Sequence, residues 1–136
     1  MSAATTIRAT ELSEPVGQFS HAVEVDASAR LVFISGMTAR LSDGSITGVG
    51  DVAAQTRQVC ENLRAAVEAA GGTLADVVRV DVYVRNIEQF DQIHSVRREY
   101  FPSSPPASTM LEVSKMVSPD MLIEINAVAA IAGVRS

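Results

Sequence analysis

The chain has 136 residues, of which 47% are hydrophobic and 20% are charged. These proportions are those of an ordinary folded domain, and they exclude a disordered or collagen-like chain. The length suits one domain over residues 1–136. The formal charge is -5, and the 11 lysine and arginine residues are dispersed. Because surfaces that bind phosphate backbones gather basic residues, we expect no nucleic acid partner.

The chain contains one cysteine, Cys60, so no disulfide can form within it and a reducing compartment is expected. Residues 1–6 lack the charged and then apolar pattern of a signal peptide. No apolar run approaches the roughly 18 residues of a membrane span. We therefore expect a cytoplasmic protein with no membrane partner. Cys60 borders an apolar helix stripe, which favours a small core residue.

Two strands are predicted first, over residues 21–25 and 31–37, joined as a hairpin across residues 26–30. Residues 31–34 are apolar on both faces, which is typical of a central, covered strand. Turn signals over residues 42–50 then predict a loop.

The clearest predicted helix runs from Asp51 to Ala70. Asp51 is suited to cap the free amides of its first turn, and apolar residues recur along it at helical spacing. Gly71 and Gly72 favour the end of this helix.

The rest of the chain alternates between the two element types. A strand is predicted over residues 77–84 and a helix over 87–101, which begins after a cap at Asn86 and ends at prolines. Two more strands are predicted over residues 109–113 and 122–130. This order predicts an α+β fold in which two helices cover one face of a mixed sheet. The other face is left partly apolar, so we expect subunit association to cover it.

Glu124 and Asn126 share one face of the last predicted strand, between residues that favour burial. A carboxylate placed at a sheet end or an interface can serve as a general acid or base. The alternative is a strand face in contact with water. His21 and His94 are the only histidines and Cys60 has no cysteine or histidine nearby in sequence, so no metal site is expected.

His94 and Arg97 border the apolar stripe of the second predicted helix. An inward arginine needs a carboxylate, which could belong to Asp91, to Glu124 or to a substrate. The alternative is a helix rotated so that both residues meet water. Arg40 follows the second predicted strand, where sites are common, although an exposed surface arginine would look the same.

The segments that carry a family resemblance follow one another in order: residues 15–23, 31–36, 50–63, 69–72, 77–80, 106–109 and 123–127. Together they resemble the YjgF/Rid family, the reactive intermediate deaminases, over about residues 15–130. The resemblance implies a chorismate-mutase-like fold assembled as a homotrimer, with ligand clefts between subunits. It also implies hydrolysis of reactive enamines or imines, such as 2-aminoacrylate, to keto acids and ammonia without a metal or organic cofactor.

The chain departs from the family pattern where the family binds its ligand. Ser108 stands where the deaminases carry the arginine of a P-A-R-[ST] motif, and serine cannot supply a two-pronged cationic clamp. Phe19 replaces a tyrosine, His94 an asparagine and Arg97 a tyrosine, whereas Glu124 is retained. By the resemblance, Glu124 places water or moves protons. His94 could assist because an ordinary histidine titrates near neutrality.

The expected ligand contacts are Phe19, Ser35, Gly36, Arg40, Arg97, Ser108 and Thr109. Arg40 or Arg97 would replace the missing clamp for a small enamine or imine carboxylate. The main hypothesis is a divergent hydrolytic deaminase that uses 2-aminoacrylate poorly. The alternative is a trimer that binds a small metabolite or regulates without catalysis. The ribonuclease activity attributed to some members finds little support in an acidic chain without a basic stripe.

Overall fold

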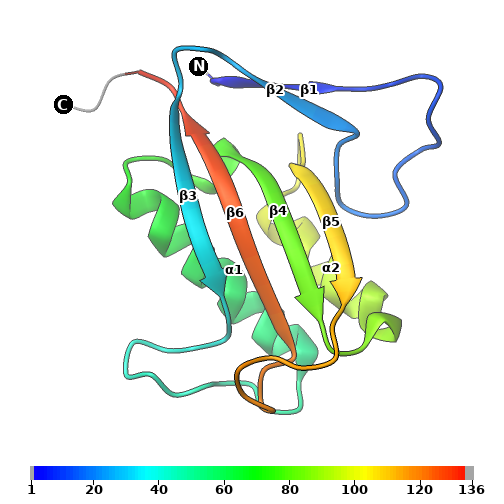
Figure 1. Cartoon of the computed structure of the whole chain (residues 1–136), viewed down its shortest axis with the longest axis vertical. Coiled ribbons are helices and arrows are strands. Elements are labelled where there is room, and N and C mark those ends of the chain that lie inside the picture. The colour runs from blue at the N-terminus through cyan, green and yellow to red at the C-terminus, as the bar shows by residue number, and fades with distance from the viewer. Residues whose placement is uncertain (1, 134–136) are drawn as a thin grey trace.

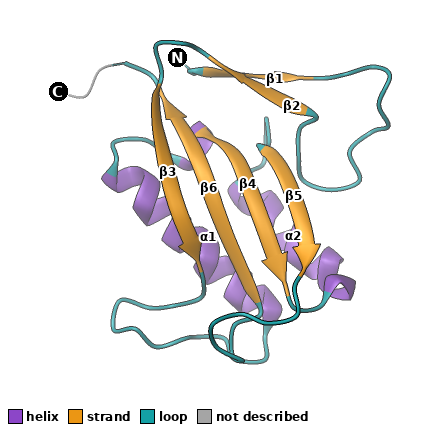
Figure 2. Ribbon diagram, viewed as in Figure 1, coloured by secondary structure: helices purple, strands orange, loops and turns teal. Residues whose placement is uncertain are grey.

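Four strands form the main sheet of the computed structural model, which describes residues 2–133 (Figures 1 and 2). Their order across the sheet is β3 (Arg30–Met37), β6 (Ile123–Ile131), β4 (Val77–Val84) and β5 (Ala107–Glu112). β6 runs antiparallel to both of its neighbours, whereas β4 and β5 are parallel. The parallel pair needs a crossover, which helix α2 (Phe90–Tyr100) provides.

Helix α1 (Val52–Ala69) and helix α2 both lie on one face of this sheet (Figure 1). The α+β fold with two helices on one face of a mixed sheet is therefore confirmed. Apolar side chains from α1, such as Val59 and Leu63, pack with Val80, Val82 and Ile125 of the sheet in one core. Each such side chain contributes about 1.5–3 kcal/mol when it is fully buried.

The predicted ends of α1 are confirmed to within one residue. The Asp51 side chain accepts a hydrogen bond from the Ala54 amide at 3.0 Å, as an N-cap does. Gly71 follows the helix with φ +91°, a conformation that glycine adopts without strain. The second predicted helix begins with a short 3-10 turn, Ile87–Gln89, that the Asn86 side chain caps.

The predicted hairpin between residues 21–25 and 31–37 is wrong. Strand β2 (Ala22–Val25) pairs instead with β1 (Ala4–Ile7), a strand that the sequence did not indicate, and together they form a separate two-stranded sheet. The Asp26 amide continues this pairing by donating to the Ala3 carbonyl at 2.8 Å. Residues 26–29 form a turn there, which carries the chain out of the small sheet and into β3.

β3 lies at an edge of the main sheet, so the prediction that it is central and covered is also wrong. Ile34 faces the helices and is buried, but Leu31 and Phe33 are 53% and 76% exposed on the other face. No helix of the described residues 2–133 covers that face (Figure 2). One apolar side of the strand packs on the core, and the other lies uncovered within residues 2–133. We call this second side the open face.

The remaining strands match their predictions closely. β5 begins two residues earlier than predicted, and β6 is displaced by one residue at each end. No helix in residues 2–133 combines the length and the apolar character that a membrane crossing requires.

Candidate functional site

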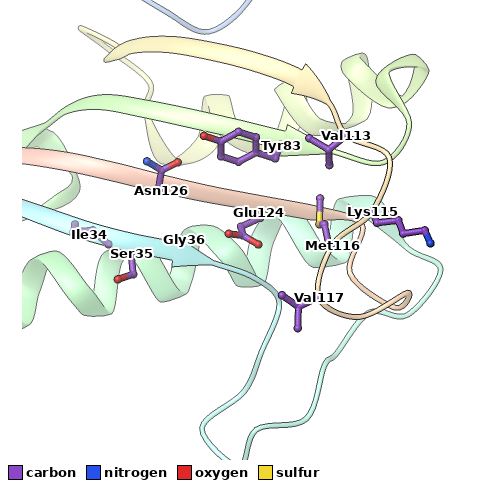
Figure 3. A pocket seen from close by; sticks show the side chains of 10 residues that line it. All are labelled: Ile34, Ser35, Gly36, Tyr83, Val113, Lys115, Met116, Val117, Glu124 and Asn126. Atoms are coloured by element: carbon purple, nitrogen blue, oxygen red, sulfur yellow. The ribbon is translucent and has the colours of Figure 1, made fainter.

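A pocket of about 800 Å³ opens on the open face near the start of β6 (Figure 3). It is lined by Ile34, Ser35, Gly36, Tyr83, Val113, Lys115, Met116, Val117, Glu124 and Asn126. We call it the open-face pocket. The strand register sets Tyr83 of β4 directly opposite Glu124 of β6. The Lys115 side chain extends away from Glu124 (Figure 3). The pocket therefore combines the Glu124 carboxylate with the Lys115 side chain, neutral polar groups and apolar walls.

Gly36 sets the position of the Glu124 carboxylate. The pairing of β3 with β6 is irregular here, because Ser35 and Gly36 together oppose the single residue Asn126. A side chain carbon at Gly36 would overlap Glu124 Oε2, so the carboxylate can lie over the backbone only because this residue is glycine. The Ser-Gly pair at the end of this strand thus makes room for the one carboxylate of the pocket.

A chain of polar contacts runs across the open face beside this pocket. The Arg79 guanidinium contacts Asp81 Oδ1 and donates to Thr109 Oγ1, each at 2.7 Å. Asn126 Nδ2 donates to Asp81 Oδ2 at 3.2 Å. The other amide atom, Asn126 Oδ1, is buried and has no hydrogen-bond partner within residues 2–133. The site residues expected from the sequence include neither Arg79 nor Tyr83, although both lie on the mostly polar face of the strand predicted over residues 77–84.

A second pocket, of about 160 Å³, lies between α2, β5 and the segment that precedes β2. It is lined by Val16, Gly17, Phe19, Phe90, His94, Arg97, Ser108 and Met110. We call it the α2 pocket. It lies on the side of the sheet that α2 covers, and it shares no lining residue with the open-face pocket.

Arg97 is only 1% exposed, yet its hydrogen bonds within residues 2–133 go only to neutral oxygens. Its Nη2 donates to Ser108 Oγ at 3.1 Å and to the Gln18 carbonyl at 3.3 Å. Its Nε has no partner, and no carboxylate of residues 2–133 forms a salt bridge with it. Neither Asp91 nor Glu124 therefore pairs with it. Burial lowers the pKa of Arg97 to about 10, so the side chain remains charged at neutral pH.

His94 lies next to Arg97 on α2 and is 4% exposed. Its ring stacks on Phe90, with centroids 3.9 Å apart, and Nδ1 donates to the Phe90 carbonyl at 3.1 Å. A side chain carbon at Gly17 would overlap His94 Nε2. Burial, with the charge of Arg97 second, lowers the pKa of His94 to about 4. The pKa of His94 thus lies below that of an ordinary histidine, and the ring is neutral at pH 7.

Known proteins resemble this chain over most of its length. A family model described as "Endoribonuclease L-PSP" matches residues 10–131. The chain belongs to the YjgF/Rid family. A RutC family protein of Pyrococcus horikoshii is 39% identical over 85% of this chain and 89% of its own. The 3-aminoacrylate deaminase RutC of Acinetobacter baylyi is 36% identical over 85% of this chain and 88% of its own.

Solved structures agree with this assignment. The crystal structure of the Rid family protein YyfB from Yersinia pestis, a protein of unknown function, is 34% identical to the chain. It superposes with a TM-score of 0.87 over 95% of this chain and 99% of its own. The fold predicted from the sequence is thus the fold of its solved relatives.

In this Rid protein the predicted site residues lie in different places. The open face holds Ser35, Gly36, Thr109 and Glu124, whereas the α2 pocket holds Phe19, His94, Arg97 and Ser108. Arg40 is in neither pocket: it is exposed, and its Nη1 donates to the Gly44 carbonyl at 2.6 Å. Cys60 is buried, which confirms it as a core residue, and burial raises the pKa of its thiol to about 12.

Proposed function

We propose that this Rid protein is a hydrolytic deaminase that releases ammonia from a small enamine or imine bearing a carboxylate. The observation that carries the proposal is the Glu124 carboxylate, held over Gly36 in a pocket open to water. Family membership and a 36%-identical relative named as a 3-aminoacrylate deaminase support it. The natural substrate differs from that of arginine-bearing relatives, because Ser108 offers no cationic clamp.

The reaction needs only proton transfers around an added water. An enamine first gains a proton on carbon and loses one from nitrogen, which gives an imine. Water then adds to the imine carbon, the carbon–nitrogen bond breaks, and a carbonyl compound and ammonia leave. In this scheme Glu124 accepts a proton from the attacking water and returns it to the departing nitrogen. Asn126 lies beside it in the lining of the pocket, where its side chain orients a polar group of the substrate.

The complete cleft forms between copies of the chain. Within one chain, Glu124 lies on the open face and Arg97 lies behind the sheet, against α2. The open face also carries large apolar side chains that a single chain leaves exposed: Leu31, Phe33 and Leu111. A second copy that covers them would bring its own edge against the open-face pocket. The homotrimer of the family resemblance is one closed arrangement of this kind.

Two measurements test the activity. Purified protein is mixed with a panel of enamines and imines generated enzymatically in place, and ammonia release is followed. We expect Glu124→Gln to lower the rate by about 100-fold or more, while Glu68→Gln, at an exposed position of α1, leaves it unchanged. Tight ligand binding with no ammonia release from any member of the panel would refute the deaminase and favour a binding protein.

The substrate claim and the assembly claim have tests of their own. Turnover of 2-aminoacrylate as fast as an arginine-bearing relative would contradict the proposed shift in substrate. Light scattering at working concentration should report an oligomer, and Phe33→Asp, which places a charge on the open face, should dissociate it. A stable wild-type monomer mass would rule out a cleft between chains.

A further inference from the structure

Arg97 is a buried cation without a counter-ion among residues 2–133. Its side chain is one of the largest fully buried ones in the chain, and its contacts are to a hydroxyl and a carbonyl. Neutral oxygens repay only part of the cost of removing a guanidinium from water, because an oppositely charged group is missing. Its Nε–H has no partner in the described chain, although the residue lines a pocket. Arg97 is therefore a buried cation beside the α2 pocket, and an anion bound there would balance its charge.

His94 adds a second requirement to the same pocket. Because Nδ1 donates its hydrogen to the Phe90 carbonyl, the neutral ring presents an unprotonated Nε2, which can only accept a hydrogen bond. No hydrogen bond to Nε2 is made within residues 2–133. His94 and Arg97 are one helical turn apart, so an acceptor and a cation are presented side by side.

We propose that Arg97 and His94 bind a short-chain acid in the α2 pocket: Arg97 takes the carboxylate, and His94 Nε2 accepts the N–H or O–H next to it. This inference rests on the proposed function and identifies which side chains recognise the substrate. The guanidinium comes from helix α2, whereas the family motif places its arginine at position 108 on a strand. Ser108 contributes a hydroxyl contact to Arg97 and leaves space for it.

The size of the pocket limits the ligand. About 160 Å³ corresponds to about five water-sized groups, which suits a small acid. Arg40, the other candidate cation, does not meet the requirements. It is exposed to solvent, and its guanidinium already contacts the Gly44 carbonyl in a separate loop.

Binding of unreactive acids by calorimetry separates the two contacts. Lactate carries a carboxylate and an adjacent hydroxyl, propionate lacks the hydroxyl, and lactamide lacks the charge. We expect lactate to bind about fivefold more tightly than propionate and lactamide not to bind measurably. Arg97→Lys should weaken lactate binding by about tenfold or more, because an ammonium cannot make the two-pronged contact. The matched control Arg98→Gln, at the adjacent exposed position, should bind lactate as the wild type does.

Several outcomes would overturn the inference. They are lactamide binding as well as lactate, propionate binding as well as lactate, or unchanged lactate binding by Arg97→Lys. If the variant does not fold, the NMR resonance of Arg97 Nε–H in the wild type provides the test. Lactate should shift this resonance, and an unchanged chemical shift would refute the site.

Glu124→Gln separates this inference from the deaminase. It should bind lactate normally while losing turnover. Ammonia release without Arg97-dependent binding would refute this site and leave the deaminase standing. Arg97-dependent binding with no release from any enamine or imine would support this site and refute the deaminase.

Discussion

Acid should destabilise this protein partly through His94, whose neutral ring is buried against Phe90 and Arg97. The folded-state pKa of His94 is lowered from 6.5 to about 4. Between these two values the unfolded chain takes up a proton at His94 and the folded chain does not, so falling pH favours unfolding. The stabilising contribution is therefore complete above pH 6.5 and is lost as the pH falls through the folded pKa near 4.

The magnitude follows from the difference between the two pKa values. A pKa lowered from 6.5 to about 4 corresponds to about 3 kcal/mol of unfolding free energy between pH 7 and pH 4. Of the charged groups near the ring, Arg97 and Arg98 lower the pKa and Asp91 raises it, but burial has the largest effect. The prediction thus depends mainly on the ring staying out of water.

Urea denaturation at fixed protein concentration, repeated across this pH range, measures the effect. His94→Gln keeps a polar side chain but cannot take up the proton. Between pH 7 and pH 4, the unfolding free energy of the wild type should fall by about 3 kcal/mol more than that of His94→Gln. For Gln92→Ala, at an exposed and uncharged position of the same helix, the unfolding free energy should change with pH as it does in the wild type. Parallel curves for wild type and His94→Gln would refute the buried, neutral ring.

Three further predictions concern other contacts. Gln55 is fully buried in α1 and accepts a hydrogen bond from the Leu122 amide at 2.8 Å, so Gln55→Leu should lower the unfolding free energy by about 2–4 kcal/mol in urea titrations. Gly36→Ala should displace the Glu124 carboxylate and slow ammonia release by about tenfold or more, with little change in melting temperature; an unchanged rate would contradict the role of this glycine. Co-expressed Glu124→Gln and Arg97→Gln chains, each inactive alone, should recover about a quarter of wild-type activity if one site draws on two chains, and no recovery would place both residues in one chain's site.

Elements with local signals could be predicted from the sequence, and elements that depend on distant partners could not. Asp51 and Gly71 mark the ends of α1 because capping involves residues only a few positions apart. The pairing of β2 depends on a strand near residue 5, which is short and carries no strong pattern. A run that is apolar on both faces, as in β3, does not show whether helices cover both faces of the strand or only one.

In the candidate site too, features set by nearby residues could be predicted, and features set by distant residues could not. The two-residue period of a strand placed Glu124 and Asn126 on one face, and helical spacing placed His94 beside Arg97. Spacing along the chain could not show that these pairs lie on opposite sides of the sheet. It also could not give the pKa of His94, because that depends on how deeply α2 packs and on the charge beside the ring. The bulge at Gly36 likewise becomes visible only in the pairing of two strands.

The unpaired Arg97 is difficult to explain by stability. An apolar side chain of similar volume would avoid the cost of burying a charge, and replacing buried ionic groups in this way is often neutral or stabilising. The chain nevertheless places a guanidinium there and holds it with Ser108 and the Gln18 carbonyl, while Nε has no partner within residues 2–133. A guanidinium that is already out of water and already oriented binds a carboxylate without those costs at the moment of binding. Recognition of an anion therefore accounts for Arg97 better than any contribution to folding does.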